Sequence, residues 1–308
     1  MHIITDARTT SERFPGLVLA VGCFDGVHLG HRQIVTALIE EAEKIGGTPG
    51  IMTLDPNPRQ FFSPGSAPNI LTPGRVKCKL LAALGVQILY FLPFDARTAA
   101  MASGTFVQEI LLDRCRIQGI IAGHDFAFGK GAAGNYEFLK ESGEKYGFFT
   151  RQVPPLITGG QRISSTLIRE LILQGEVDTL PRYLGRHYSI TGVVQSGRGI
   201  GRTLGFPTVN LDPGECAIPA HGVYAARARL KGVAYQAAVN IGIAPTIQHD
   251  KPMIEAHLLD FSGNITGEEI EVIFYRRMRP EQRFHSREAL VDAIACDVEV
   301  VREYFSAL

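Results

Sequence analysis

The chain has 308 residues, of which 45% are hydrophobic and 20% charged, and its formal net charge is zero. This length suits two globular domains, and the neutral charge gives no reason to expect binding to nucleic acid or to a membrane surface. No apolar run approaches the roughly 20 residues of a membrane span, and the first ten residues lack the apolar core of a signal peptide. The five cysteines are scattered without a C-x-x-C pair, so we expect reduced thiols in a cytoplasmic protein.

The first half of the chain alternates apolar strands with helical patterns. The strands are expected at 17–22, 50–55, 86–92 and 117–123, and the helices at 34–45, 75–85 and 105–115. Strands that alternate with helices form right-handed βαβ units and a parallel sheet. Ligands bind such sheets at the carboxyl ends of the strands. We therefore predict a Rossmann-like α/β domain over residues 1–181.

The second half changes character near residue 182, after the predicted linker at 180–186. Its β-rich segments with turn residues between them predict a small antiparallel barrel. Residues 287–305 are amphipathic, with apolar side chains recurring on one face of a terminal helix. The predicted fold class is thus α/β plus β, with a second domain over residues 182–308.

A first motif, GCFDGVHLGH at residues 22–31, directly follows the first predicted strand. Gly22 and Gly26 let the backbone approach a ligand closely. A helix that begins near His28 directs free N–H groups and a positive dipole end toward an anion. His28 and His31 share one side of that first turn. Together these features predict a polyphosphate site in which two imidazoles stabilise charge that develops on a phosphate.

Two alternatives compete with the phosphate site. A zinc site needs further ligands, but H-x-x-H differs from the H-E-x-x-H spacing and no cluster of Cys or His accompanies it. The pair could also be ordinary surface histidines.

A second motif, SGRGIGRTLGFPTVNL at residues 196–211, is the densest glycine-rich stretch of the second half. It lacks the spacing and the lysine of a Walker A loop, and it does not fit the dinucleotide-binding G-x-G-x-x-G pattern. A glycine-rich hairpin is the alternative to a phosphate site. Thr208 and Asn210 alternate on one strand face, and their oxygens are the hard ligands that Mg²⁺ accepts alongside phosphates.

Residues 22–31 resemble the HxGH signature of the nucleotidyltransferase superfamily. Their form is most similar to the FMN adenylyltransferase half of bifunctional bacterial riboflavin kinase/FAD synthetases. Three further stretches match in the expected order: TLDPNPRQFF (53–62), AGHDFAFGKGAAG (122–134) and RISSTLIRELILQGEV (162–177). The resemblance implies that ATP and the flavin are bound by Gly22, Phe24, Asp25, Gly26, Asp55, Asn57, Asp125, Phe126, Phe128, Arg162, Ser164, Ser165, Thr166 and Arg169. Asn57 is a departure, because histidine is often expected at this position.

The same residues also have local interpretations. Phe126 and Phe128 could stack on a flavin or adenine ring, or they could be core residues. One of the hydroxyl residues at 164–166 is expected to cap a helix, which is compatible with phosphate binding because both use the same N–H groups. Arg169 lies one helical turn beyond Thr166 and would supply a cation to the same anion.

The second half is similar to riboflavin kinases over nearly all its length. The stretches GRTLGFPTVN (201–210), HGVYAA (221–226), NIGIAPTI (240–247) and IEAHLLDF (254–261) follow in family order. In that pattern Glu255 corresponds to the base for the riboflavin 5′-hydroxyl, although a lone strand glutamate is usually solvated. The resemblance implies that Thr208 and Asn210 bind Mg²⁺, and that nucleotide and flavin are bound by Gly197, Gly201, Arg202, Gly205, Phe206, Pro207, Arg279 and Phe284. Ala244 and Thr266 depart from the usual pattern.

The resemblance implies a bifunctional enzyme whose small-molecule partners are ATP, riboflavin and FMN. The second domain would phosphorylate riboflavin to FMN, and the first would transfer AMP from ATP to FMN, giving FAD and pyrophosphate. His28 and His31 would stabilise the transition state, and no nucleophilic side chain is needed. Two alternatives are a nucleotidyltransferase for another substrate and a non-catalytic flavin- or nucleotide-binding protein. A homo-oligomer is possible, because nothing in the sequence decides the oligomeric state.

Overall fold

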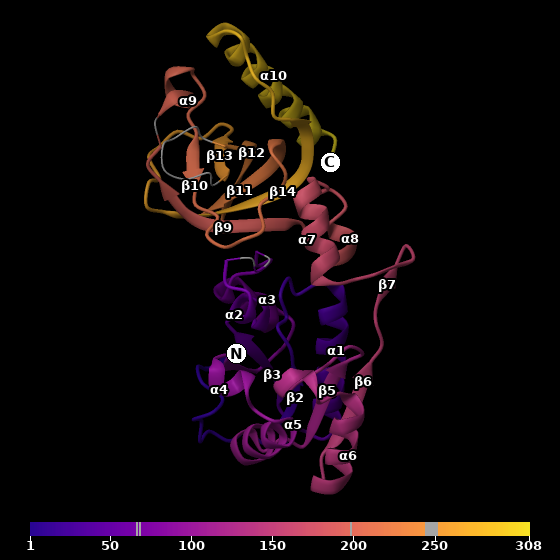
Figure 1. Cartoon of the computed structure of the whole chain (residues 1–308). Helices are drawn as coiled ribbons and strands as arrows, with labels where there is room; N and C mark the ends of the chain where they lie inside the picture. The colour runs from indigo at the N-terminus through magenta and orange to yellow at the C-terminus, as the bar shows by residue number, and fades with distance from the viewer. Residues whose placement is uncertain (66, 68, 198, 244–251) are drawn as a thin grey trace. The chain divides into compact units, whose positions relative to one another are not determined.

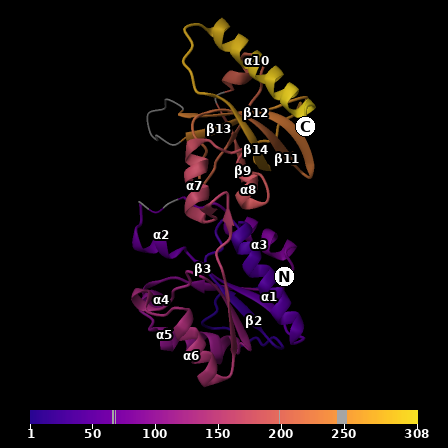
Figure 2. The same ribbon diagram turned by 90° about the vertical axis from the view of Figure 1, so that its right-hand side faces the viewer.

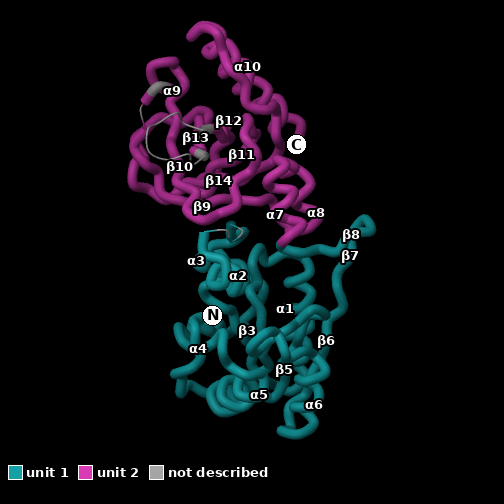
Figure 3. The backbone as a smooth tube through the Cα atoms, in the orientation of Figure 1, with its two compact units in different colours: residues 1–165 teal, residues 166–308 magenta. Residues whose placement is uncertain are grey.

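The computed structural model describes residues 1–65, 67, 69–197, 199–243 and 252–308. These residues form two compact units, Met1–Ser165 and Thr166–Leu308, which Figure 3 draws in different colours. The contacts divide the chain before the boundary at 181/182 that the change in sequence pattern predicts, so residues 166–181 are grouped with the second unit. None of the helices in the described ranges is both long enough and apolar enough to cross a membrane.

The first unit is built on a six-stranded parallel sheet with the strand order β1-β4-β3-β2-β5-β6. Its strands are β1 His2–Ile4, β2 Val18–Val21, β3 Pro49–Asp55, β4 Ile88–Pro93, β5 Gly119–Gly123 and β6 Phe149–Val153. Strand β2 pairs with β3 on one side and with β5 on the other. The order of the strands therefore reverses at β2, and in open α/β sheets ligands bind at the carboxyl ends of strands at such a switch point.

Helices cover both faces of this sheet (Figure 1; Figure 2). They are α1 Leu29–Lys44, α2 Pro58–Phe62, α3 Gly74–Ala83, α4 Ala96–Ala99, α5 Ser103–Thr105, the π-helix η1 Phe106–Cys115, the 3₁₀-helix η2 Lys130–Ala132 and α6 Tyr136–Tyr146. On one face, Leu38 of α1 and Leu81 of α3 join a buried cluster with the strands. On the other face, Leu111 of η1 and Leu139 of α6 join a second cluster.

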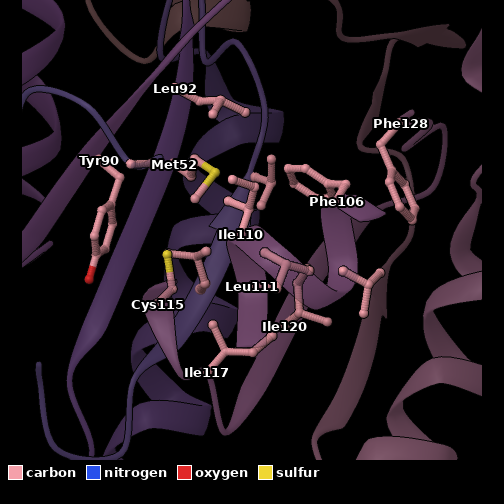
Figure 4. Close-up of a cluster of buried hydrophobic side chains, with 14 of the residues drawn as sticks. Met52, Tyr90, Leu92, Phe106, Ile110, Leu111, Cys115, Ile117, Ile120 and Phe128 are labelled. Atoms are coloured by element: carbon pink, nitrogen blue, oxygen red, sulfur yellow. The ribbon is translucent and has the colours of Figure 1, made fainter. Parts of the chain in front are cut away.

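Figure 4 shows this second cluster, in which side chains from the sheet and from η1 interdigitate. Met52, Tyr90 and Leu111 are fully buried, and Ile120 is 1% exposed. The tight packing fixes the central strands, and with them the loops that leave their carboxyl ends.

The predicted parallel sheet is confirmed, and it contains two edge strands that the hydrophobic pattern did not indicate. Strand β1 has only three residues, and β6 carries polar side chains because edge strands are less buried. The helix expected at 105–115 is a π-helix from Phe106 onward. Its buried residues, which pack in the core of the first unit, are Phe106, Val107, Ile110, Leu111 and Cys115.

The second unit contains the predicted antiparallel barrel, closed in the order β10-β13-β12-β11-β14-β9. Its strands are β9 Tyr188–Gln195, β10 Val209–Leu211, β11 Gly222–Leu230, β12 Val233–Ile243, β13 Pro252–Leu258 and β14 Glu269–Pro280. Strand β10 pairs with both β13 and β9, which closes the ring. Inward-facing side chains such as Val239, Ile254 and Phe274 are fully buried and fill the interior.

Four helices accompany the barrel: α7 Ser165–Gln174, α8 Pro181–Leu184, α9 Ile200–Thr203 and α10 Arg287–Ser306. The terminal helix α10 packs through Val298, Val301 and Phe305 against Ala225 of β11. Helix α7 is tied to the barrel region because the backbone N–H of Ala220 donates to the carbonyl of Ile172. This hydrogen bond explains why α7 is grouped with the second unit.

Candidate active sites

The loop between β2 and α1, which carries the first motif, is strained. Phe24 and Val27 have φ angles of 48° and 41°, in the left-handed region that side chains disfavour. Both are 2% exposed or less, so core packing holds the loop in this conformation. Gly26, at a φ of 90°, needs the freedom of a glycine. Strain of this kind costs on the order of 1–3 kcal/mol per residue and is typical of functional sites.

The loop brings the two predicted histidines into contact at the start of α1. The His28 and His31 rings stack with centroids 3.6 Å apart and planes 13° apart. His28 is the N-cap of α1, and its Nδ1 accepts a 3.2 Å hydrogen bond from the backbone N–H of His31. A neutral His28 ring therefore carries its proton on Nε2. Gly30 makes room for this arrangement, because a Cβ there would lie 3.2 Å from the His28 ring.

The environment of His31 makes its imidazole less basic than that of an ordinary histidine. Its Nδ1 is buried and has no hydrogen-bond partner among the described residues. Burial lowers the pKa of His31 well below 6.5, and the charges of His28 and Lys77 lower the pKa further. At neutral pH His31 is therefore an uncharged ring that can donate or accept one hydrogen bond.

The carboxylate of Asp25 holds the loop, and the predicted contact of this residue with a ligand stays a prediction. Its oxygens accept hydrogen bonds from the backbone N–H groups of Leu71 and Thr72 at 2.9–3.1 Å, just before α3. The residue is 4% exposed. Its backbone carbonyl accepts a 2.8 Å hydrogen bond from Ser165 Oγ. Asp25 thus joins three separate segments at the carboxyl end of β2.

The stretch TLDPNPRQFF (53–62) lies at the carboxyl end of β3 and continues into α2. Asp55, the last residue of the strand, is exposed. Asn57 is the N-cap of α2: its side chain accepts from the Arg59 N–H, and its own N–H donates to the Gln60 side chain at 3.1 Å. This capping box gives the asparagine that replaces the usual histidine a structural role.

An aromatic cluster that was not among the predicted site residues follows Asn57. Phe61, Phe62 and Phe94 have ring centroids 5.3–5.7 Å apart, and Phe62 is 65% exposed. In the sequence, the two adjacent phenylalanines at the end of DPNPRQFF could have indicated this cluster. Such rings offer an apolar stacking surface beyond the carboxyl ends of β3 and β4.

The stretch AGHDFAFGKGAAG (122–134) begins at the end of β5, on the other side of the switch point. Asp125 forms an ion pair with Arg162 of the hairpin β7 Ile157–Thr158 and β8 Gln161–Arg162. The structure thus brings two predicted residues together, both largely exposed. Phe126 stacks on Phe128, with centroids 5.3 Å apart. Phe128 is 9% exposed and packs in the core, so of the two rings Phe126 is the one left partly accessible.

The stretch RISSTLIRELILQGEV (162–177) spans the boundary between the compact units. Ser164 and Ser165 end the first unit, and Thr166 begins the second. Thr166 is exposed at the start of α7, whereas Arg169 is 8% exposed. The predicted contacts of Thr166 and Arg169 with ATP stay predictions.

In the second unit, the register of the barrel places Glu255 between two asparagines. Glu255 of β13 lies directly opposite Asn210 of β10 and Asn240 of β12. Directly paired residues of antiparallel strands project from the same face, so the three polar residues form a row on the outer face of the barrel. The flanking Ile254 and Ala256 are fully buried on the inner face. Asn240 was not among the predicted site residues, because its position depends on strand register.

The glycine-rich loop that precedes β10 packs closely on the predicted magnesium ligands. A Cβ at Gly197 would lie 1.8 Å from Asn210 Nδ2, and one at Gly201 would lie 3.0 Å from Thr208 Oγ1. Gly205 has a φ of 89°. These three positions therefore require glycine, and Arg202 between them is exposed.

His257, two residues beyond Glu255, supports the end of this loop. Its Nδ1 donates a 2.8 Å hydrogen bond to the Pro207 carbonyl, and its ring lies 5.6 Å from that of Phe206. The strand that carries Glu255 thus also positions the segment leading to Thr208. This second-site contact, too, was invisible in the sequence.

Arg279 and Phe284, predicted to border the flavin, lie together before α10. The Arg279 guanidinium is 5.8 Å from the Phe284 ring centroid. Its Nε and a terminal nitrogen also donate to both carboxylate oxygens of Asp297 at 2.8 and 2.7 Å. This bidentate pair fixes Arg279 to α10. Of the two departures from the family pattern, Thr266 lies in an exposed turn bonded to Asn264, and Ala244 lies outside the described residues.

The predicted magnesium ligands fit an ion that arrives with a nucleotide. Among the described residues, no group of three or more His, Cys, Asp or Glu side chains could hold a metal ion. Thr208 and Asn210 offer two neutral oxygens, and Mg²⁺ usually completes its octahedron with water and phosphate oxygens.

Comparison with known proteins identifies both domains. Residues 10–167 match the family model described as FAD synthetase, and residues 184–305 match the one described as riboflavin kinase. The chain belongs to the bifunctional riboflavin kinase/FMN adenylyltransferase family. It is an enzyme of flavin biosynthesis that uses ATP and flavins, which confirms the predicted resemblance and excludes both a different nucleotidyltransferase and a non-catalytic binding protein.

Relatives of this name are similar along the whole chain. The protein of Pseudomonas fluorescens is 34% identical and covers 98% of this chain and 97% of its own. The Escherichia coli K12 protein is 36% identical, and the match covers 94% of this chain and 93% of that protein. The Bacillus subtilis protein is 32% identical, and the match covers 100% of this chain and 98% of that protein. A crystal structure from Streptococcus pneumoniae, described as a macrolide-efflux protein, has a TM-score of 0.89 at 28% identity, covering 98% and 99% of the two chains. The likeness to it establishes the shared fold.

Proposed function

We propose that the two units catalyse successive steps, with His28 and His31 acting in FMN adenylylation and Glu255 in riboflavin phosphorylation. For the first unit, the supporting observation is the stacked histidine pair at the N-terminus of α1, beside the switch point of the sheet. For the second unit, it is the row of Asn210, Glu255 and Asn240 on one face of the barrel.

In the first unit, a phosphate oxygen of FMN attacks the α-phosphorus of ATP. The new P–O bond forms as the bond to the β-phosphate bridging oxygen breaks, and pyrophosphate leaves with that electron pair. No side chain becomes covalently modified. The free N–H groups of α1 and its positive dipole end stabilise the triphosphate. His28 donates from Nε2 to the charge that develops on the transferred group.

The flavin of FMN needs an apolar surface beside this phosphate site. The exposed Phe62 ring, at the end of α2, and the partly accessible Phe126 ring follow β3 and β5, the two strands on either side of β2. We propose that these rings contact the isoalloxazine, while Asp55 and the pair of Asp125 and Arg162 contact polar atoms of the substrates. Phe128 supports Phe126 from the core.

In the second unit, Glu255 accepts the proton of the riboflavin 5′-hydroxyl as that oxygen attacks the γ-phosphorus of ATP. The bond to the β-phosphate bridging oxygen breaks, and ADP leaves. Asn210 and Thr208 would hold Mg²⁺, which supplies charge neutralisation on the phosphates when it is bound. The glycine-rich loop at 197–205 lets backbone N–H groups approach the nucleotide. Arg279 and Phe284 would border the flavin.

We also propose that the enzyme acts in the cytoplasm on small molecules alone. All five cysteines are free in the structure, as expected in a reducing compartment. A neutral net charge gives no electrostatic basis for a nucleic-acid partner.

Product analysis tests the assignment of the sites. The protein is incubated with riboflavin, ATP and Mg²⁺, and FMN and FAD are separated by chromatography. His28→Ala should lower the rate of FAD formation by roughly 10²–10³-fold while FMN accumulates. Glu255→Gln should abolish FMN formation from riboflavin while supplied FMN is still converted to FAD. Loss of both activities in either folded variant would contradict the two-site assignment.

A further inference from the structure

A lysine outside all the recognised motifs contacts the strained loop of the adenylyltransferase site. Lys77, half-buried on α3, donates from Nζ to the Cys23 carbonyl at 2.8 Å and to Thr53 Oγ1 at 3.2 Å. Thr53, fully buried in β3, donates to the same carbonyl at 3.1 Å. The ammonium group therefore lies between the carboxyl ends of β2 and β3. Its acceptor Cys23 directly precedes the strained Phe24.

The ammonium has no anionic partner within the described ranges of the chain. Its two hydrogen bonds go to neutral oxygens, and no carboxylate forms an ion pair with it. Arg8, by contrast, is a half-buried cation that is paired with two carboxylates, those of Asp6 and Asp95. A lysine that has lost much of its hydration without a counter-ion is destabilising unless a ligand supplies the negative charge.

Lys77 also retains an N–H group for such a ligand. An ammonium has three protons, and two are used by Cys23 and Thr53. The same charge is close enough to His31 to lower the pKa of its imidazole. The cation thus lies at the end of β2, against the loop that leads to the stacked histidines.

We infer that Lys77 is a further catalytic residue of FMN adenylylation, whose ammonium binds a phosphate oxygen of ATP beside His28 and His31. The inference rests on the proposed function of the first unit. With His31 neutral, Lys77 is the group that brings a full positive charge to this loop from the sheet side. Negative charge increases on the pyrophosphate leaving group as the bond to the α-phosphorus breaks, and an ammonium fixed by two neutral acceptors stabilises it.

A merely structural role is the competing explanation, because Lys77 also tethers the Cys23 carbonyl. Two variants separate the roles. Lys77→Gln keeps a hydrogen-bond donor without the charge, whereas Lys77→Arg keeps the charge. Lys79→Gln is the matched control, since Lys79 is exposed two residues further on the same helix. Riboflavin kinase activity and thermal unfolding are measured for every variant.

If Lys77 binds the nucleotide, Lys77→Gln should lower kcat for FAD formation by roughly 10²-fold or more. Lys77→Arg should recover part of this loss, and Lys79→Gln should match the unsubstituted protein. The riboflavin kinase rate should stay unchanged throughout. Lys77→Gln activity within threefold of the control would overturn the inference, because the retained donor would then suffice.

A measurement on the unsubstituted protein covers the case in which Lys77→Gln fails to fold. Lysines are acetylated with limiting acetic anhydride, with and without ATP and Mg²⁺, and each site is quantified by mass spectrometry. ATP should protect Lys77 several-fold and leave Lys79 unaffected. Equal labelling of Lys77 with and without ATP would overturn the inference. Absence of FAD formation by the unsubstituted protein would instead contradict the proposed function of the first unit.

Discussion

Ser165 Oγ donates a 2.8 Å hydrogen bond to the backbone carbonyl of Asp25, 140 residues earlier in the chain. The bond connects the first residue of α7 with the loop that leads to His28 and His31, the histidines proposed to be catalytic. Asp25 in turn holds the segment before α3 through its carboxylate. The position of the histidine loop therefore depends on segments distant in sequence.

Ser165→Ala removes this hydrogen bond and leaves the carbonyl without that donor. We expect a cost of about 1 kcal/mol, or about fivefold in the rate of FAD formation from FMN. Ser165→Thr, which keeps a hydroxyl, is the control and should retain most of the rate. Equal rates for the two variants would show that the bond does not position the loop. The readout is steady-state FMN adenylylation.

Gly30→Ala tests the contact between the helix and the His28 ring. The added Cβ would lie 3.2 Å from two ring atoms of His28, which is closer than side chains normally approach. The ring must move, so we expect FAD formation to slow by at least tenfold while riboflavin phosphorylation is unchanged. Gly104→Ala is the control, because a Cβ there meets nothing within 4 Å. Similar adenylylation rates for both variants would exclude a requirement for this ring position.

The pKa of His31 predicts how the first unit responds to acid. Burial, His28 and Lys77 all lower this pKa well below 6.5, so His31 stays neutral in the folded state at pH 6.5. Below pH 6.5 the unfolded chain binds a proton that the folded chain does not, so the contribution of His31 to stability is lost as the pH falls. NMR titration of the His31 ring should show no midpoint near 6.5. His31→Gln should reduce the loss of stability between pH 6.5 and 5, measured by chemical unfolding.

Gly197→Ala tests the contact between the glycine-rich loop and Asn210. A Cβ would overlap the Asn210 amide at 1.8 Å, so the loop or the amide must be displaced. We expect riboflavin phosphorylation to fall by roughly 10²-fold, comparable to loss of one transition-state donor, with FMN adenylylation intact. The neighbouring exposed residue supplies the control, Ser196→Ala, which should be near normal. Unchanged riboflavin phosphorylation by Gly197→Ala would show that the reaction does not depend on the position of the Asn210 amide.

Asp297→Asn tests the attachment of Arg279 to α10. The substitution removes the charge from a bidentate pair whose side chains are 24% and 12% exposed. We expect the second unit to lose about 1.5–3 kcal/mol in unfolding free energy and riboflavin to bind with a higher KM, since Arg279 is no longer fixed. Asp292→Asn, an exposed position on the same helix, should change neither quantity. An unchanged KM would separate Arg279 from flavin binding.

Local sequence patterns predicted the parts of both sites that lie within one segment. The histidine pair, the glycine loop and the strands that follow an apolar pattern all depend on near neighbours in the chain. The contacts that a pattern cannot contain are those set by register and by distant packing. Asn240 faces Glu255 because β12 pairs with β13 in one register. Thr53 of β3 reaches the Cys23 carbonyl because β2 and β3 are neighbours in the sheet, and Lys77 of α3 donates to both residues.

Motif resemblance also assigned Asp25 to ligand binding, whereas its carboxylate is used by backbone N–H groups of the protein. A pattern of residue types does not distinguish a side chain that holds a loop from one that holds a substrate. In the same way Asn57 caps a helix and Phe128 packs in the core.

The boundary between the compact units falls between Ser165 and Thr166, inside the I-S-S-T stretch. The two family models leave residues 168–183 between them, and this interval holds most of α7 and α8. A gene cut where the compact units meet would sever the last adenylyltransferase motif. Separating the two activities onto different chains therefore requires a cut after α7. The adenylyltransferase chain would then carry α7, a helix that is grouped with the second unit. The arrangement makes fission of this gene harder than its two-part architecture suggests.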